Sequence, residues 1–359
     1  MAILNSSPSR ILCWTCGSLG ILFNILVVVI NCQNLRKRKI NSRIASTIKI
    51  QFERNRSLAI SMSKKINNQC KLGQVAATLF LSLSLADMLS SIYLLVLCIA
   101  DIGVGATYNQ TFARTSVSYN FTFSHSHRRW ARSFPCTVLR FISITGATAS
   151  CQTTLLITLD RYVALVYPLK FQLKCNFKRA LLFCVLIWFT SCILGAIACY
   201  ITDVTMKNVS IVNWYRDLCL IDDISNSDVQ IYIFLSGCSA VIIYGATSIV
   251  YIAIGYNLRK TGYFGKIRAI IQSSKSNSTK IDRGVILTTG LITITNILCW
   301  MPVTVISFGY TLGYDGYKNE KFAPFGVFIT LLFPANCLFN PMIFLILYWY
   351  PTFLRYSNT

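Results

Sequence analysis

The stretch from Cys136 to Tyr162 ends in a pair of opposite charges. It reads CTVLRFISITGATASCQTTLLITLDRY, so Asp160 and Arg161 stand side by side just before Tyr162. The preceding residues are apolar enough to enter a membrane, and their many small side chains favour packing against other helices. A carboxylate and a guanidinium at a membrane edge can pair with each other or with a partner on a moving helix. We interpret the stretch as a central helix, although an isolated Asp-Arg pair would more simply be a snorkelling arginine.

Other polar side chains fall near the middle of apolar runs. An Asp in the hydrocarbon layer is costly unless it is paired or solvated, so Asp87 is a candidate functional residue. Ser150 lies eleven residues before Arg161, which is three helical turns and the depth expected for Asp87. The further members of this polar group are Asn24, Asn336 and Asn340. Such oxygens suit a hard monovalent cation with water, and the alternative is a hydrogen-bonded polar core without an ion.

The composition places these residues in a membrane protein. Of the 359 residues, 54% are hydrophobic and only 13% are charged, whereas about a quarter of the residues in a soluble domain are charged. The net charge of +22 could indicate nucleic-acid binding, but the basic residues lie between apolar runs. Anionic lipid headgroups and an intracellular partner explain this distribution better, so we expect no nucleic acid as a partner.

Seven apolar runs are long enough to cross about 30 Å of hydrocarbon. They predict an all-α membrane protein with a seven-transmembrane helix bundle. The runs lie at about 11–33, 74–100, 134–160, 179–201, 229–255, 284–310 and 323–349. The first run exceeds the apolar core of a signal peptide and is followed by basic residues, so we interpret it as a retained span. Residues 1–10 and 350–359 are then short tails.

The distribution of Lys and Arg predicts the orientation. These residues gather after the first, third and fifth spans, while most acids lie in the opposite segments. Cytoplasmic loops carry an excess of Lys and Arg, so we expect the N-terminus outside the cell and residues 350–359 in the cytoplasm. Acceptor sequons on the outer side predict glycosylation at Asn5, Asn109, Asn120 and Asn208.

Two of the expected loops are long. Residues 101–133 form an external loop, and residues 34–73 form a basic cytoplasmic loop. The basic loop is expected to lie on anionic headgroups, with an interfacial helix between Ile48 and Met62 as one interpretation and a disordered insert as the other.

The sequence LDRYVALVYPLKF, which begins at Leu159, resembles the end of the third span in rhodopsin-like G-protein-coupled receptors. Further matches occur at compatible spacing in the fourth, sixth and seventh spans. They are Trp188, Cys299-Trp300-Met301-Pro302 and Asn340-Pro341. The preceding Pro334-Ala335-Asn336 resembles the seventh span of receptors that carry leucine-rich repeats outside. The resemblance implies a plasma-membrane receptor that binds an extracellular ligand and activates a heterotrimeric G protein when the sixth span moves outward.

The resemblance also implies roles for single residues. Asp282, at the inner end of the sixth span, would accept a hydrogen bond from Arg161 in the resting state, with a solvated charge as the alternative. Pro302 bends its helix, so the ring of Trp300 can couple a bound ligand to helix tilt. The implied switch comprises Asp160, Arg161, Tyr162, Tyr251, Asp282, Trp300, Pro302, Asn340 and Pro341. The implied sodium site comprises Asp87, Ser150, Asn336 and Asn340.

Most of the fifteen cysteines lie within spans, where Cys acts as a small apolar residue. Cys136 opens the third span on the outer side and Cys219 follows the fourth span, where oxidation is expected. The resemblance implies a disulfide between these two residues, with Trp130 at the family's Trp position in the first external loop.

The same resemblance places a ligand pocket in the outer half of the bundle. Its implied lining is Arg140, Ser143, Ala147, Trp300, Thr304, Ser307 and Thr330. Ser143 stands where amine receptors carry Asp, and Pro334 stands where visual pigments carry the Lys that binds retinal. We therefore expect a peptide, a small protein or a lipid as ligand rather than an amine or retinal.

Several positions depart from the family pattern. Phe344 stands where the family has Tyr, Asn296 stands where it usually has Phe, and the usual Pro near Ile243 is absent. These departures leave open a receptor-like protein that binds a ligand without signalling.

Two other function classes are disfavoured. Mid-membrane polar residues also couple ions in secondary transporters, but we find neither an internal repeat nor paired broken spans. No nucleophile, base and orienting group recur together and no metal-ligand cluster appears, so we expect neither an enzyme nor a cofactor beyond a structural or allosteric sodium ion.

Overall fold

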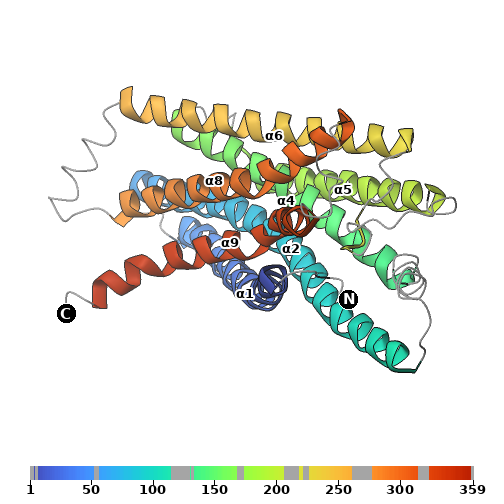
Figure 1. The fold of residues 1–359 in the computed structure, drawn as a ribbon. Coiled ribbons are helices and arrows are strands. Elements are labelled where there is room, and N and C mark those ends of the chain that lie inside the picture. The colour runs from blue at the N-terminus through green and yellow to red at the C-terminus, as the bar shows by residue number, and fades with distance from the viewer. Residues whose placement is uncertain are drawn as a thin grey trace.

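The computed structural model describes residues 4, 7–51, 56–114, 130, 133–167, 174–205, 218–220, 226–260, 277–313 and 323–356. Within these ranges the backbone alone is described at 38–39, 41–51, 56–72, 104–114, 205, 277–287, 310, 323–324 and 348–356. The helices are α1 (Ser7–Gln51), α2 (Arg56–Arg114), α4 (Phe134–Val166), α5 (Phe177–Thr205), α6 (Ser227–Lys260), α8 (Asn277–Thr311) and α9 (Ala323–Tyr356). These ranges contain no strand, and Figure 1 shows the helices gathered into one bundle. The predicted all-α seven-helix bundle is confirmed.

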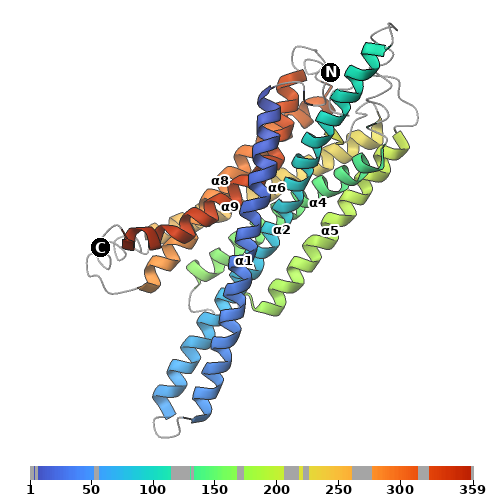
Figure 2. The ribbon, with the colours of Figure 1, turned by 90° about the horizontal axis from the view of Figure 1, so that it is seen from below.

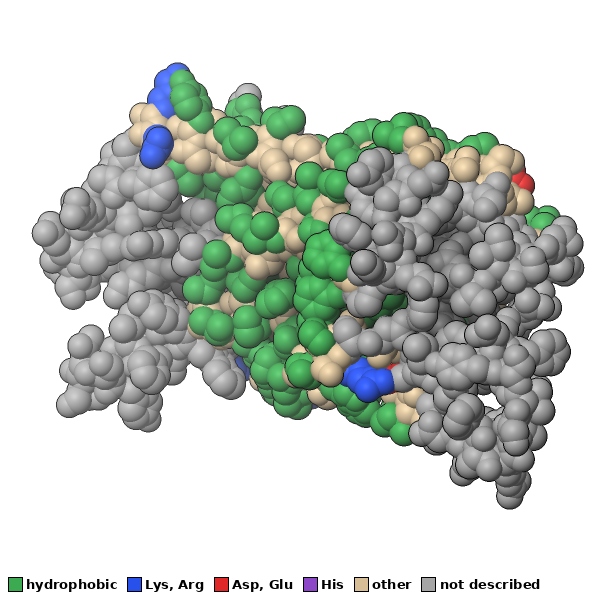
Figure 3. All heavy atoms as spheres, in the orientation of Figure 1, with side chains coloured by type: hydrophobic (Ala, Val, Ile, Leu, Met, Phe, Trp, Pro, Cys, Tyr) green, Lys and Arg blue, Asp and Glu red, His purple; other side chains and the backbone are tan. Residues whose placement is uncertain are grey.

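The outward faces of the helices are apolar. Each of the seven helices contains a stretch that is long and apolar enough to cross a membrane, the shortest being Thr288–Gly309 with 22 residues. Large apolar side chains on these faces are exposed, and Phe189, Ile242 and Ile252 are exposed by 63%, 70% and 72%. Figure 3 shows hydrophobic side chains over the middle of one face, with Lys and Arg toward one end of α6. Lipid is the solvent that such a surface fits.

The helix α4 is the centre of the bundle. It packs against α2, α5, α6, α8 and α9, and its buried face runs from Cys136 to Asp160. Small residues allow this close packing, since a Cβ at Gly146 would lie 2.8 Å from the carbonyl oxygen of Ala86 on α2. The central position expected for this stretch therefore follows from its small side chains.

The segment expected as a loop at residues 34–73 is largely helical. The helix α1 continues to Gln51, and α2 begins at Arg56. The sequence has no Gly or Pro from residue 21 to residue 72, so no helix breaker ends α1 at the membrane edge, and α2 continues through the single Gly73. Figure 2 shows the two extensions side by side beyond the other helices. They replace both the disordered insert and the separate interfacial helix that the composition suggested.

The helices extend beyond the predicted spans at other ends as well. The helix α2 continues to Arg114 in the segment expected as the external loop, and α9 continues to Tyr356 in the expected C-terminal tail. Residues 115–129 of the external loop lie outside the described residues.

Candidate functional site

Asp87 of α2 joins three helices through its carboxylate. The hydroxyl of Ser150 on α4 donates to Asp87 Oδ1 at 2.8 Å, and Nδ2 of Asn340 on α9 donates to Oδ2 at 2.8 Å. The Asp87 side chain is only 2% exposed, so these contacts form in a dry interior. Three of the side chains that the sequence placed at one depth are thus in direct contact.

A second polar chain runs one helical turn away. Asn296 of α8 donates from Nδ2 to the Thr154 hydroxyl of α4 at 2.9 Å, and Asn336 of α9 donates to Asn296 Oδ1. Thr154 lies one turn after Ser150, and Asn336 lies one turn before Asn340. Asn296 therefore links α4, α8 and α9, a role that sequence reasoning missed. An Asn within an apolar span was the available signal, because buried amides there require partners.

The polar group offers oxygens that a cation could use. The Oδ1 atoms of Asn24, Asn336 and Asn340 are buried and accept no hydrogen bond from any described residue. The ion pairs found among the described residues, at Asp101 and Asp160, do not include Asp87. An anionic carboxylate with spare amide oxygens nearby fits the donor set of a sodium ion. Asn24 instead fixes helices, since its Nδ2 donates to the carbonyl of Gly20 at 2.8 Å and to that of Cys337 at 2.9 Å.

Trp300 lies on α8 one helical turn from Asn296, toward the outer end of the helix. Its ring packs against Tyr244 of α6 at a centroid distance of 5.7 Å and against Phe333 of α9 at 5.5 Å. Pro302 lies two residues further along the same helix. Sequence motifs identified Trp300 and Pro302, whereas Tyr244 and Phe333 are aromatic residues in apolar runs without a recognisable pattern.

At the inner end of α4, Arg161 Nη2 lies 2.7 Å from Asp160 Oδ2. Their side chains are 11% and 4% exposed, and the Arg161 Nε has no hydrogen-bond partner among the described residues. Asp282 lies in α8, but its side chain is outside the described residues, so the expected contact with Arg161 stays a prediction. The ring of Tyr162 meets that of Tyr167 edge-on at 5.9 Å.

A further contact holds α6 and α8 together near their inner ends. The Tyr251 hydroxyl lies 2.9 Å from the Thr289 hydroxyl, in a hydrogen bond that either group can donate. A Cβ at Gly290 would lie 2.8 Å from Tyr251 Oη, so only glycine leaves room for this ring. Pro341 of the expected switch is buried in α9, next to Asn340.

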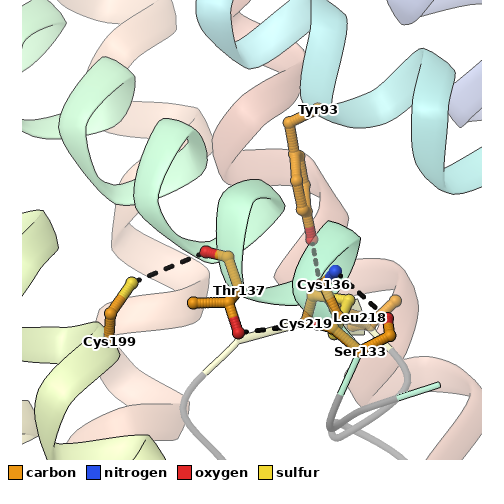
Figure 4. Close-up of a disulfide and its surroundings, with 7 residues drawn as sticks. All are labelled: Tyr93, Ser133, Cys136, Thr137, Cys199, Leu218 and Cys219. Carbon is orange, nitrogen blue, oxygen red and sulfur yellow. Dashed lines mark hydrogen bonds between the residues drawn. A yellow bond between two sulfur atoms is a disulfide. The ribbon is translucent and has the colours of Figure 1, made fainter. Parts of the chain in front are cut away.

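At the outer end, Cys136 and Cys219 form a disulfide, which ties the segment at residues 218–220 to the start of α4 (Figure 4). Tyr93 of α2 donates to the Leu218 carbonyl at 2.8 Å, and the Ser133 hydroxyl accepts from the Cys136 N–H at 3.3 Å. Trp130 packs against the hydrophobic core cluster that contains Cys136, Leu218 and Cys219. The backbone of Asn109 lies in α2 without a described side chain, and the other predicted sequons, Asn5, Asn120 and Asn208, lie outside the described residues.

The expected pocket residues lie on three helices. On α4, Arg140, Ser143 and Ala147 are buried, by 2%, 1% and 6% exposure, and the Ser143 hydroxyl has no described hydrogen-bond partner. The other hydroxyls bond to carbonyl groups of their own helices, at 2.9 Å for Thr304, 2.8 Å for Ser307 and 2.8 Å for Thr330. These three hydroxyls therefore offer a ligand their remaining acceptor capacity rather than a free proton.

The sequence pattern of the family described as 7 transmembrane receptor (rhodopsin family) matches residues 68–344. The chain belongs to this family. The receptor is thus a multi-pass protein of the plasma membrane, and proteins of this family are generally signalling receptors rather than enzymes. G proteins and extracellular ligands are the partners that this membership implies.

Comparison with individual proteins gives distant relatives. The receptor is 24% identical over 281 residues to the G-protein coupled receptor GRL101 of Lymnaea stagnalis, covering 76% of this chain and 22% of the relative. It is 23% identical over 281 residues to the follicle-stimulating hormone receptor of Cairina moschata, covering 78% and 35%. With proteinase-activated receptor 1 of Xenopus laevis it shares 25% identity over 189 residues, covering 52% and 41%. The receptor thus spans less than half the length of these relatives.

Proposed function

We propose that the receptor, with its N-terminus outside the cell, converts the binding of an extracellular ligand into activation of a heterotrimeric G protein. The observation that carries this proposal is the bridge from Asn296 to Thr154 and Asn336, which joins α8 to α4 and α9 in the buried interior. Asn296 lies one turn from Trp300, whose ring contacts α6 and α9. A ligand that displaces this ring would therefore strain the bridge below it.

The contacts of α8 divide into three levels along the helix. Trp300 packs at the outer level, Asn296 bonds at the middle level, and Thr289 meets Tyr251 at the inner level. Pro302 removes a backbone hydrogen bond and gives α8 a place to bend. Outward movement of the inner half of α8 would break the two lower contacts and open the surface beside Arg161 for a G protein.

We propose that the resting state is stabilised by contacts among Asp160, Arg161 and Asp282. The Arg161 Nη2 pairs with Asp160 at 2.7 Å, while its Nε is left without a described acceptor. A carboxylate from α8 would complete the set of hydrogen bonds around the guanidinium. In the active state the same guanidinium, with Tyr162 beside it, would face the G protein.

The departures at Asn296 and Phe344 are consistent with a signalling receptor. Phe344 packs against Phe80 of α2 at a ring distance of 5.0 Å, so it acts through apolar packing in place of a hydroxyl. Asn296 supplies a polar contact that joins α8 to α4 and α9. The hydrogen bonds that join these helices therefore lie at Asn296, further toward the outer side than position 344, where the family has Tyr. This arrangement argues against a protein that binds a ligand without signalling.

A sodium ion is proposed as an allosteric ligand of the resting state. Asp87, Ser150, Asn336 and Asn340 would hold it, and it would neutralise a carboxylate that lies in the membrane interior. Bound sodium would keep α2, α4 and α9 together and oppose the binding of an agonist.

The ligand is proposed to be a peptide, a small protein or a lipid. Ser143 supplies no charge for an amine, and Arg140 provides a buried positive charge at the outer part of α4. A hormone is the ligand named for one of the relatives, the follicle-stimulating hormone receptor, which supports a peptide or protein ligand by similarity. The basic extensions of α1 and α2 would meet anionic lipid headgroups at the cytoplasmic surface.

Nucleotide exchange tests the proposed function directly. The purified receptor would be placed in lipid nanodiscs, supplied with G proteins of several subtypes, and screened with peptide, protein and lipid ligands. A ligand that accelerates exchange by one subtype is the expected result. Sodium-driven uptake into proteoliposomes without any exchange would instead support the transporter alternative, which the family match does not favour.

A further inference from the structure

The outer halves of α1 and α2 touch backbone to backbone. A Cβ at Gly17 of α1 would lie 2.8 Å from the main-chain nitrogen and 3.0 Å from the Cα of Leu95 on α2. A Cβ at Gly20 would collide with the side chain of Ser91, one turn further in. These two glycines therefore fix both the close distance and the antiparallel register of the helices.

An ion pair confirms the same register at the outer end. Arg10 Nε of α1 lies 3.0 Å from Asp101 Oδ2 of α2, and the main-chain N–H of Leu4 donates to Asp101 Oδ1 at 2.8 Å. The pairs Arg10 with Asp101 and Gly17 with Leu95 lie two turns apart on both helices. The turn between them places Cys13 of α1 opposite Cys98 of α2.

The surroundings of Cys13 and Cys98 agree with this placement. Both are free thiols, exposed by 0% and 1%, and they belong to one core cluster. A disulfide needs Cα atoms about 4.4–6.8 Å apart, and the backbone contact of Gly17 with Leu95, one turn away, holds α1 and α2 close together near these cysteines.

Cysteine also serves as a small apolar residue between helices, and two other cysteines of the receptor illustrate this role. Cys337 of α9 directs its sulfur to the carbonyl oxygen of Cys16 at 3.6 Å. Cys199 of α5 likewise directs its sulfur to the carbonyl of Thr137 at 3.5 Å, as Figure 4 shows. Cys13 and Cys98 differ, because the register of α1 and α2 places each thiol opposite another thiol.

We propose that Cys13 and Cys98 form a second disulfide, which ties α1 to α2 at the outer end of the bundle. The first disulfide supports this placement, since Cys136 and Cys219 belong to the same core cluster as Cys13 and Cys98. One end of the molecule thus carries both pairs, in the compartment where disulfides form. The fully buried Leu4 in this cluster would shield the bond from reductants once it has formed.

The bond would form by thiol–disulfide exchange with a disulfide donor of the secretory pathway, either a protein or glutathione disulfide. A thiolate from one cysteine attacks the donor disulfide, and the second cysteine then displaces the donor from the mixed disulfide. The receptor pair loses two electrons, the donor gains two electrons, and the two protons of the receptor thiols end on the donor thiols. Exchange must take place while α1 and α2 assemble, because both sulfurs are buried in the finished bundle.

Peptide mapping of the full chain tests this proposal. The receptor is produced through the secretory pathway, its free thiols are blocked with N-ethylmaleimide in detergent at denaturing concentration, and it is digested without reduction. Mass spectrometry is expected to find one linked peptide pair that contains Cys13 and Cys98 and another that contains Cys136 and Cys219. Recovery of Cys13 and Cys98 as alkylated thiols, with Cys136 still linked to Cys219, would overturn the proposal.

Two variants sharpen the test. In Cys13→Ser, Cys98 is expected to be alkylated while the bond between Cys136 and Cys219 persists, and the melting temperature is expected to fall. The matched control is Cys16→Ser, which changes a buried thiol one turn away on the same helix and should leave Cys13 linked to Cys98. A linked peptide that joins Cys98 to Cys16 in the unaltered receptor would equally contradict the assignment.

Discussion

Asn296 of α8 donates a hydrogen bond from Nδ2 to the Thr154 hydroxyl of α4 at 2.9 Å, and its Oδ1 accepts from Asn336 of α9. One side chain thus spans three helices in a buried position with 0% exposure. Movement of α8 away from α4 must break this bridge, which makes Asn296 the residue whose loss most directly favours the moved state.

Asn296→Ala is expected to raise signalling in the absence of ligand. Each hydrogen bond that it removes stabilises the resting state by about 1 kcal/mol, so the active population rises several-fold or more. A second-messenger assay at matched surface expression measures the change. Thr295→Ala is the control, because the Thr295 hydroxyl bonds to carbonyls of its own helix.

Thr154→Val removes one end of the same bridge. If the bridge acts as a unit, the basal signalling of the double variant with Asn296→Ala should equal that of Asn296→Ala alone. Additive effects of the two substitutions would show that they act separately and would sink the bridge as the common cause.

The inner contact between α6 and α8 gives a second prediction. Gly290→Ala puts a methyl group 2.8 Å from Tyr251 Oη, which must displace the ring and break its bond to Thr289. Because this contact belongs to the resting state, we expect signalling without ligand to rise in both Gly290→Ala and Tyr251→Phe. Gly245→Ala is the matched control, since a Cβ at Gly245 of α6 has no atom within 4 Å.

Equal basal signalling in Gly290→Ala, Gly245→Ala and the unaltered receptor would contradict this account. The result would mean that the contact between Tyr251 and Thr289 does not distinguish the resting state from the active state.

The polar group around Asp87 predicts sensitivity to sodium. Sodium chloride should lower agonist affinity in the unaltered receptor, compared with choline chloride at equal ionic strength. Asp87→Asn keeps the side-chain shape but removes the charge, so this sodium effect should disappear. Competition binding of a labelled ligand measures it, and a sodium effect that survives in Asp87→Asn would rule out the site.

The sequence predicted the number and class of the helices, because apolar runs of membrane length allow few other structures. It also placed Asp87, Ser150 and Asn340 at one depth, since the helical rise alone sets the spacing along α4. The partners of Asn296 and Trp300 could not be predicted, because they depend on how helices rotate against each other. Thr154 and Tyr244 lie on different helices, and nothing local to either residue marks the contact.

The hydropathy pattern of the sequence also could not predict the lengths of the helices. Hydropathy marks where a chain enters the lipid, whereas a helix ends at a breaker or a cap. Since α1 meets no Gly or Pro near the inner membrane edge and α2 meets only Gly73, both helices pass through it. The thiol pair of Cys13 and Cys98 likewise needs the register that Gly17 sets, which composition does not reveal.

The central claim is that this receptor activates a G protein through Arg161 at the inner end of α4. The most direct measurement is the rate of guanine-nucleotide exchange on purified G proteins of several subtypes, with the Asn296→Ala receptor in nanodiscs as an agonist-independent activator. We predict faster exchange on at least one subtype, and its complete loss when Arg161→Ala is added. Exchange that stays at the rate of empty nanodiscs for every subtype, or that persists without Arg161, would contradict the account.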